Sequence, residues 1–147
     1  MSAHLTDIPF SKLALADELK NALAQAGLEF CTPIQAATLP LLLNDKDCSG
    51  QAQTGTGKTL AFLLGTLQHL LNSNKKCLPG KPHALILAPT RELALQIHKD
   101  AELLTKNMAI NNALIYGGKA YDQQKALFQE PVHILIGTPG RLIDFFK

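Results

Sequence analysis

One stretch of the chain decides its fold, and its sequence is Ala52-Gln53-Thr54-Gly55-Thr56-Gly57-Lys58-Thr59. A phosphate-binding loop has a Gly, four free positions and then Gly-Lys-Ser/Thr. The last three fixed positions are met here, and Ala52 replaces the first Gly, where only a small residue is needed. The stretch therefore predicts a loop that encloses the phosphates of a nucleotide.

The residues on either side of this loop predict a strand before it and a helix after it. Residues 46–51 are a short run of small and β-tolerant residues, which favours a buried strand, and residues 60–64 begin a strongly apolar helix. Gly55 and Gly57 can adopt backbone angles closed to other residues, so that consecutive N–H groups point at phosphate oxygens. The N-terminus of the helix adds a partial positive charge to the same site.

Two side chains of the loop are candidate catalytic residues. Lys58 is placed to reach the β- and γ-phosphates, and the Thr59 hydroxyl is placed to bind Mg²⁺. The structural alternative is a plain hairpin that contains glycine. The context of strand, loop and helix favours the phosphate site over that alternative.

Composition favours one globular domain. With 147 residues, of which 46% are hydrophobic and 18% charged, the chain can bury a core, whereas two full domains would need more residues. The formal net charge is only +2, so any contact with nucleic acid would come from locally placed groups and backbone amides.

The cysteines favour a reducing compartment. Cys31, Cys48 and Cys77 are odd in number, widely spaced and without a CxxC pair, which also argues against a zinc site. No segment approaches the length of about 18 apolar residues that a membrane span needs, and the first ten residues lack a signal-peptide pattern. We therefore expect a soluble, cytoplasmic protein with no membrane partner.

The remaining chain predicts helices that alternate with strands. A helix with Leu15, Leu19 and Leu23 on one face is expected to end near Gly27. Further helices are expected at residues 33–44, from the phosphate loop to about 72–76, at 91–106, at 119–129 and from 141 onward. Strands are expected at residues 46–51, 84–88, 113–116 and 132–136. This alternation predicts an α/β fold, a three-layer parallel sheet with helices on both faces.

Ligands of such sheets bind at the carboxyl ends of the strands, so the loops at that edge are candidate sites. Four loops are expected there, at residues 52–59, 89–91, 117–118 and 138–141. Three carry Gly or Thr immediately before a helix and two carry Arg, a combination suited to oxygen-rich anions. Each loop alone is better explained as an ordinary turn, and it is their agreement that favours anion binding.

Taken together, these motifs resemble the first RecA-like domain of the DEAD-box RNA helicases, and the resemblance covers nearly the whole chain. The phosphate loop has that family's form, with Ala at its first position. Residues 27–35 are similar to its Q motif, 89–94 to its motif Ia, Gly117-Gly118 to its double glycine and 138–141 to its motif Ib. Residues 31–35, 116–122 and 140–144 resemble the bacterial RhlB type within the family, which is associated with RNA degradation.

The resemblance implies a site for ATP and Mg²⁺. Gln35 would recognise the adenine edge with its amide, and Phe10, upstream of the Q motif, would stack on the ring. Residues 52–59 would hold the phosphates, with Lys58 on them and Thr59 on the metal.

The resemblance also implies a site for single-stranded or partly duplex RNA, with a partner from the RNA-degradation machinery. The implied RNA-binding residues are Thr90, Arg91, Gly117, Gly118, Thr138 and Arg141. Such contacts go to phosphates and sugars, so they would carry affinity without sequence information. The implied activity couples ATP binding and hydrolysis to local separation of an RNA duplex.

The chain ends before the point where the family places Asp-Glu-Ala-Asp and the second helicase domain. We therefore expect residues 1–147 to be the N-terminal part of a RecA-like ATP-binding domain, with a Q-motif region at 1–35 and a P-loop core at 36–147. We expect this piece to bind ATP and RNA weakly, without turnover, because the missing groups supply large rate factors.

Two other functions remain open from the sequence. A non-catalytic RNA-binding module would keep the RNA contacts and bind RNA equally well after Lys58→Ala. Another P-loop ATPase, acting for instance on DNA, would share the phosphate loop but has no reason to carry Gln35 with Phe10 upstream.

Overall fold

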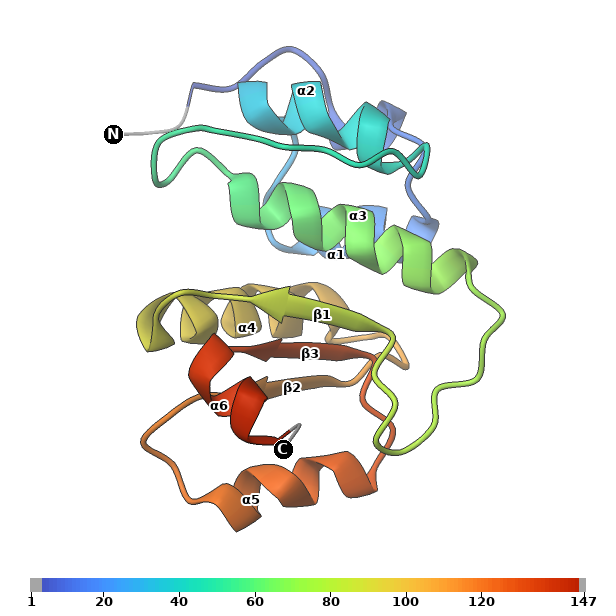
Figure 1. Ribbon diagram of the computed structural model, residues 1–147. Coiled ribbons are helices and arrows are strands. Elements are labelled where there is room, and N and C mark those ends of the chain that lie inside the picture. Colours follow the sequence, from blue (N-terminus) through green and yellow to red (C-terminus); the bar gives the residue numbers. More distant parts are fainter. Residues whose placement is uncertain (1–3, 146–147) are drawn as a thin grey trace. The chain divides into compact units, whose positions relative to one another are not determined.

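The computed structural model describes residues 4–145, and the chain divides into two compact units between Asn74 and Lys75. The first unit is helical and the second contains a sheet (Figure 1). The expected boundary after residue 35 falls inside the first unit.

The described part of the first unit is built from short and medium helices. They are the 3₁₀ helix η1 (Phe10–Lys12), α1 (Asp17–Gln25), α2 (Pro33–Leu42) and α3 (Lys58–Asn72). The predicted helices are confirmed except at one start: α1 begins at Asp17, so Leu15, which was expected on its face, is buried just before it. Apolar spacing and Thr32-Pro33 at the start of α2 specify the helices locally. α2 and α3 pack closely, since a Cβ added to Gly65 would lie 3.0 Å from Cβ of Leu42.

The strand expected at residues 46–51 is wrong. The segment has no strand conformation and all six of its residues are exposed. The backbone N–H of Lys46 donates to the oxygen of Leu41 at 3.0 Å, which closes the end of α2, and Asp45 has a φ of 54°. The segment includes Lys46 and Asp47 and offers too few apolar side chains to be buried as a central strand.

The second unit is a parallel sheet with helices. Its elements are β1 (Ala84–Leu87), α4 (Arg91–Thr105), β2 (Asn112–Ile115), α5 (Tyr121–Ala126), η2 (Leu127–Gln129), β3 (Ile134–Gly137) and α6 (Pro139–Phe145). The strand order is β1-β3-β2, and both pairings are parallel. Three of the four expected strands and their parallel arrangement are thus confirmed.

Helices cover both faces of this sheet, as predicted (Figure 1). α4 packs on β2 and β3, and it contributes a buried stripe that includes Ala94, Ile97 and Leu104. A separate core cluster lies on the opposite face. It contains Ala113, Ile115, Val132, Leu135 and Leu142, with Phe128 and Phe145 packed against them.

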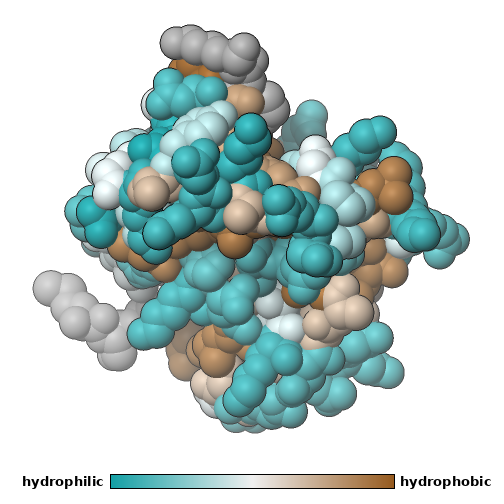
Figure 2. Space-filling model, turned by 90° about the horizontal axis from the view of Figure 1, so that it is seen from below, coloured by the Kyte–Doolittle hydropathy of each residue, from teal (hydrophilic) through white to brown (hydrophobic). Residues whose placement is uncertain are grey.

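The surface is mixed in character. Figure 2 shows one face on which hydrophilic residues predominate and apolar ones lie in separate patches. On β1, at one edge of the sheet, Leu85 and Leu87 are exposed by 52% and 57%. Within residues 4–145, no helix combines the length and the apolar character needed to cross a bilayer.

Candidate functional site

The phosphate loop has the backbone conformation that its glycines predict. Gly55 and Gly57 have φ angles of 78° and 91°, in the left-handed region that favours glycine. Gly57 is the N-cap of α3, and no side chain caps the helix there. Because the first N–H groups of a helix need acceptors, an uncapped start next to such a loop suits a bound anion.

Lys58 is folded back onto its own loop. Its Nζ donates to the backbone oxygens of Ala52 and Gln53, the latter at 2.6 Å. The Thr56 hydroxyl also donates to the oxygen of Gln53, at 2.7 Å. An incoming phosphate would therefore replace carbonyl oxygens as partners of the Lys58 ammonium.

Gln35 connects the start of α2 with the phosphate loop. Its Oε1 accepts from the backbone N–H of Thr32 at 2.9 Å, and its Nε2 donates to the oxygen of Gly57 at 3.1 Å. The side chain is buried, with 3% of the residue exposed. A carboxamide has two donors and two acceptor sites, so one of each is still available to a ligand.

Thr32 places a buried polar atom beside the loop. Its Oγ1 faces the backbone N–H of Gln35 in the capping box of α2, but it makes no full hydrogen bond among residues 4–145. A Cβ added to Gly57 would lie 3.0 Å from this atom, so Oγ1 faces the end of the phosphate loop. A buried hydroxyl without a partner is costly, and a polar ligand group could satisfy it.

Phe10 lies beside the segment that resembles the Q motif. Its backbone N–H donates to the oxygen of Glu29 at 3.0 Å, and the Pro9–Phe30 bridge lies next to it. The ring belongs to the core of the first unit, with 2% of the residue exposed. Stacking on an adenine would require one face of this ring to be uncovered.

Three of the four predicted loops lie together at the carboxyl edge of the sheet. Ala88 donates to the oxygen of Gly137 at 2.9 Å, and Thr138 donates to the oxygen of Ile115 at 3.1 Å, so the strands enter their loops side by side. Thr90, Gly117, Gly118 and Thr138 therefore share this edge. The fourth loop, residues 52–59, belongs to the first unit.

Three cationic side chains meet at this edge. Cζ of Arg91 lies 4.7 Å from the centre of the Tyr116 ring, and Nζ of Lys119 lies 5.3 Å from it. Nη1 of Arg141 donates to the backbone oxygen of Lys119 at 2.9 Å. No carboxylate within the described part of the chain forms an ion pair with these three cations. Their charges are therefore available to an anionic ligand.

Thr90 has a structural role as well as a predicted binding role. Its Oγ1 accepts from the backbone N–H of Leu93 at 3.2 Å and so caps α4. The hydroxyl hydrogen is not used by this bond and can be donated to a ligand oxygen.

Sequence reasoning missed Tyr116, Lys119 and Gln124 as parts of this edge. Tyr116 is 3% exposed and supports two cations, and Gln124 is hydrogen-bonded to the backbone of Tyr116. Tyr116 and Lys119 flank the double glycine, which was the one available sequence indication, whereas Gln124 lies further along the chain in α5. Their contacts depend on how the chain returns along α5, which no spacing rule specifies.

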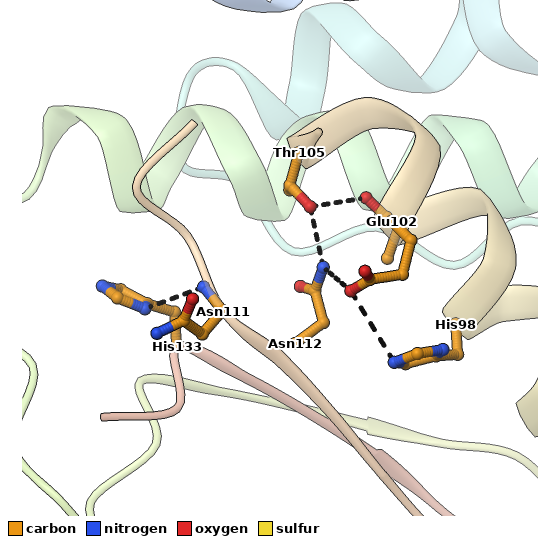
Figure 3. A network of polar contacts seen from close by, with 7 residues as sticks. His98, Glu102, Thr105, Asn111, Asn112 and His133 are labelled. Atoms are coloured by element: carbon orange, nitrogen blue, oxygen red, sulfur yellow. Dashed lines mark hydrogen bonds and ion pairs between the residues drawn. The ribbon is translucent and has the colours of Figure 1, made fainter. Parts of the chain in front are cut away.

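A second polar cluster lies at the opposite, amino end of the sheet (Figure 3). Nδ2 of Asn112 donates at 2.8 Å both to Oε1 of Glu102 and to Oγ1 of Thr105. His98 lies 3.7 Å from the same carboxylate. Glu102, Thr105 and Asn112 border an open hollow of about 580 Å³, and Asn112 Oδ1 is buried without a partner among residues 4–145. None of the predicted site residues lies there.

Comparison with known proteins gives consistent matches. A family model described as DEAD/DEAH box helicase matches residues 32–147. A protein named ATP-dependent RNA helicase RhlB from Shewanella oneidensis is 52% identical over 149 residues, which cover 98% of this chain and 33% of that protein. A protein of the same name from Vibrio vulnificus is 53% identical over 146 residues, covering 98% and 34%.

The fold has a solved counterpart. The crystal structure of a DEAD box protein from the hyperthermophile Methanococcus jannaschii superposes with a TM-score of 0.79 at 37% identity, covering 93% of this chain and 36% of that chain. This chain thus spans about a third of the length of the curated relatives it matches. These similarities agree with the RhlB-type resemblance inferred from the sequence.

Proposed function

This chain belongs to the DEAD/DEAH box helicase family, and on that premise we propose that it binds ATP and single-stranded RNA as part of an ATP-dependent RNA helicase. The observation that carries the proposal is the link between Gln35 and Gly57, because it joins a carboxamide to the end of a phosphate loop. Hydrolysis and duplex separation are proposed for a longer protein, because the named relatives are about three times as long.

The proposed nucleotide site lies within the first unit. The N–H groups at the start of α3 and the Lys58 ammonium would bind the phosphates, and the spare donor and acceptor of Gln35 would bind the adenine edge. Phe10 would stack on the base once its ring is uncovered. Thr59 would contribute its hydroxyl to Mg²⁺, which neutralises phosphate charge when bound.

The proposed RNA site is the carboxyl edge of the sheet in the second unit. Arg91, Lys119 and Arg141 would contact phosphates, because all three are cationic and none is neutralised by a described carboxylate. The exposed backbone at Gly117 and Gly118 and the hydroxyls of Thr90 and Thr138 would add hydrogen bonds to phosphates and sugars. Binding would depend on salt more than on base sequence.

We also propose a cellular compartment and a protein partner. Three free thiols support a reducing, cytoplasmic compartment. The RhlB-type resemblance supports a protein partner from RNA degradation.

Equilibrium binding of a fluorescent ATP analogue tests the nucleotide site. We expect ADP to compete and GDP to compete poorly, and we expect this preference to be lost in Gln35→Ala. The matched control is Gln51→Ala, because Gln51 is an exposed glutamine just before the phosphate loop. Equal competition by both nucleotides would contradict adenine recognition by Gln35.

RNA binding distinguishes the proposal from its rivals. We expect Arg141→Ala to weaken binding of a labelled single-stranded RNA, and we expect ATP to alter the affinity of the wild-type chain but not that of Lys58→Ala. RNA binding that is indifferent to both ATP and Lys58→Ala would instead favour a non-catalytic module. A preference for single-stranded DNA would favour the rival ATPase.

A further inference from the structure

Gln124 makes an unusual pair of hydrogen bonds with one residue of the RNA edge. Its Oε1 accepts from the backbone N–H of Tyr116 at 2.9 Å, and its Nε2 donates to the backbone oxygen of the same residue at 3.0 Å. Both residues are 3% exposed. Buried bonds of this kind are costly to break, because each leaves a backbone group without a partner.

The geometry of β2 explains why a side chain is needed here. Within a strand, the N–H and C=O of one residue point to the same side, and the next residue points to the other. The oxygen of Ile115 accepts from Thr138 and therefore points toward β3. The backbone of Tyr116 then points to the outer edge of β2, where no strand of the described chain pairs. The carboxamide of Gln124 takes the place of a strand at this position.

The bonds fix a residue that supports two of the three cations. Arg91 and Lys119 both lie over the Tyr116 ring. The same loop is held at Lys119 by the hydrogen bond from Arg141. The segment from Tyr116 to Gln124 is thus anchored at its start, its middle and its end, although Gly117 and Gly118 within it are exposed.

We propose that Gln124 is a positioning residue for RNA binding, which holds Tyr116 in place and through it sets the positions of Arg91 and Lys119. This inference rests on the proposed RNA-binding function of the edge. Gln124 itself is buried and touches no RNA; its effect is to keep two cations at a fixed spacing before the ligand arrives, which lowers the ordering cost of binding.

The test compares three single variants of the 147-residue chain. Gln124→Met keeps the length of the side chain and removes both hydrogen bonds. Gln124→Glu is the second variant, which keeps the acceptor for the Tyr116 N–H and loses the donor to its oxygen. Gln123→Met is the matched control, because Gln123 is the exposed neighbour on α5. Tyrosine fluorescence verifies folding, since the two tyrosines of the chain, Tyr116 and Tyr121, both lie in the second unit.

Two readouts separate positioning from simple loss of stability. The first is the NMR resonance of the Arg91 Nε–H, which the Tyr116 ring current shifts; it needs no RNA. The second is the affinity for a labelled single-stranded RNA as a function of salt. We expect Gln124→Met to move the Arg91 resonance toward the chemical shift of an arginine in an unfolded chain. We also expect it to weaken RNA binding about tenfold. The plot of the logarithm of the binding constant against the logarithm of the salt concentration should also become less steep, by about 0.7 in slope for each phosphate that the variant no longer neutralises.

The outcomes separate the inference from the proposed function. Gln124→Met or Gln124→Glu that folds, keeps the Arg91 resonance and binds RNA like the wild type overturns the positioning role. A change of the same size in Gln123→Met overturns it as well. If the wild-type chain binds no RNA, the proposed function fails together with the RNA part of the inference. The Arg91 resonance then still decides whether Gln124 positions the cation.

Discussion

The carboxamide of Gln35 donates to the backbone oxygen of Gly57 at 3.1 Å, so the first turn of α2 is bonded to the residue that caps α3. The approach is close, because a Cβ added to Gly57 would lie 2.3 Å from Nε2 of Gln35. The second glycine of the phosphate-loop pattern and the candidate base-binding residue therefore depend on each other sterically.

We predict that Gly57→Ala abolishes measurable binding of the fluorescent ATP analogue. The new Cβ would displace Gln35 as well as strain a residue with a φ of 91°, and overpacking of this kind costs about 1–3 kcal/mol. Gly55→Ala is the matched control, because it shares the positive φ but meets no atom within 4 Å. Its cost should be limited to the backbone term of about 1–2 kcal/mol. Equal loss of binding in both variants would show that the contact with Gln35 is unimportant.

Lys58→Ala should weaken nucleotide binding about 100-fold while changing the unfolding midpoint little. The ammonium supplies a charge-assisted bond to phosphate, worth about 1.5–3 kcal/mol, whereas its present partners Ala52 and Gln53 can turn to water. Isothermal titration and thermal unfolding measure the two effects. A large drop in stability would mean that the contacts of Lys58 with its own loop are structural.

The stability of the second unit should decrease below about pH 6.5. Burial lowers the pKa of His133, and the charge of nearby His83 lowers it further. Nδ1 of His133 also accepts from the backbone N–H of Asn111 at 3.1 Å, which requires that nitrogen to be unprotonated (Figure 3). With a folded pKa below the unfolded value of about 6.5, the unfolded chain binds more protons as the pH falls. The stabilisation that comes from unprotonated His133 is complete above the unfolded-state pKa and is lost as the pH falls through the lower pKa of the folded state.

Urea unfolding followed by tyrosine fluorescence between pH 8 and 5.5 measures this dependence. His133→Gln should flatten the dependence of the unfolding free energy on pH, because the titrating group is gone. His98→Gln is the control, since His98 lies 3.7 Å from Glu102, whereas the ring next to His83 is that of His133. A wild-type curve that is flat over this range, or that rises as the pH falls, would contradict the prediction.

Short sequence patterns were sufficient to predict the helices and strands whose ends are set by residues close by in the chain. Thr32-Pro33 marked the start of α2, Gly27 the end of α1, and three apolar runs the strands of the sheet. The strand predicted at residues 46–51 was wrong, because residues that tolerate β structure form a strand only where a neighbouring strand pairs with them. The pairing of Gln124 with Tyr116 could not be predicted either, because it depends on the direction in which β2 presents its backbone.

Gly137 offers the sharpest steric test of the sheet. A Cβ at this position would lie 2.6 Å from the backbone oxygen of Ile115 and 3.2 Å from Cδ1 of Leu142. The first contact is with the backbone of β2, which cannot move without disturbing its pairing with β3. We predict that Gly137→Ala destabilises the second unit by about 1–3 kcal/mol, as overpacking against a rigid neighbour does.

The control for this change is three residues away. Gly140 lies in α6 with no atom within 4 Å of its added Cβ, so Gly140→Ala should be neutral or stabilise the unit by up to about 1 kcal/mol. Urea unfolding followed by tyrosine fluorescence distinguishes the two, because both tyrosines report on this unit. Since Gly137 immediately precedes Thr138, the same variant should also weaken RNA binding. If Gly137→Ala were as stable as Gly140→Ala, β2 and β3 would have to separate easily at their carboxyl ends, and the RNA edge could not be rigid.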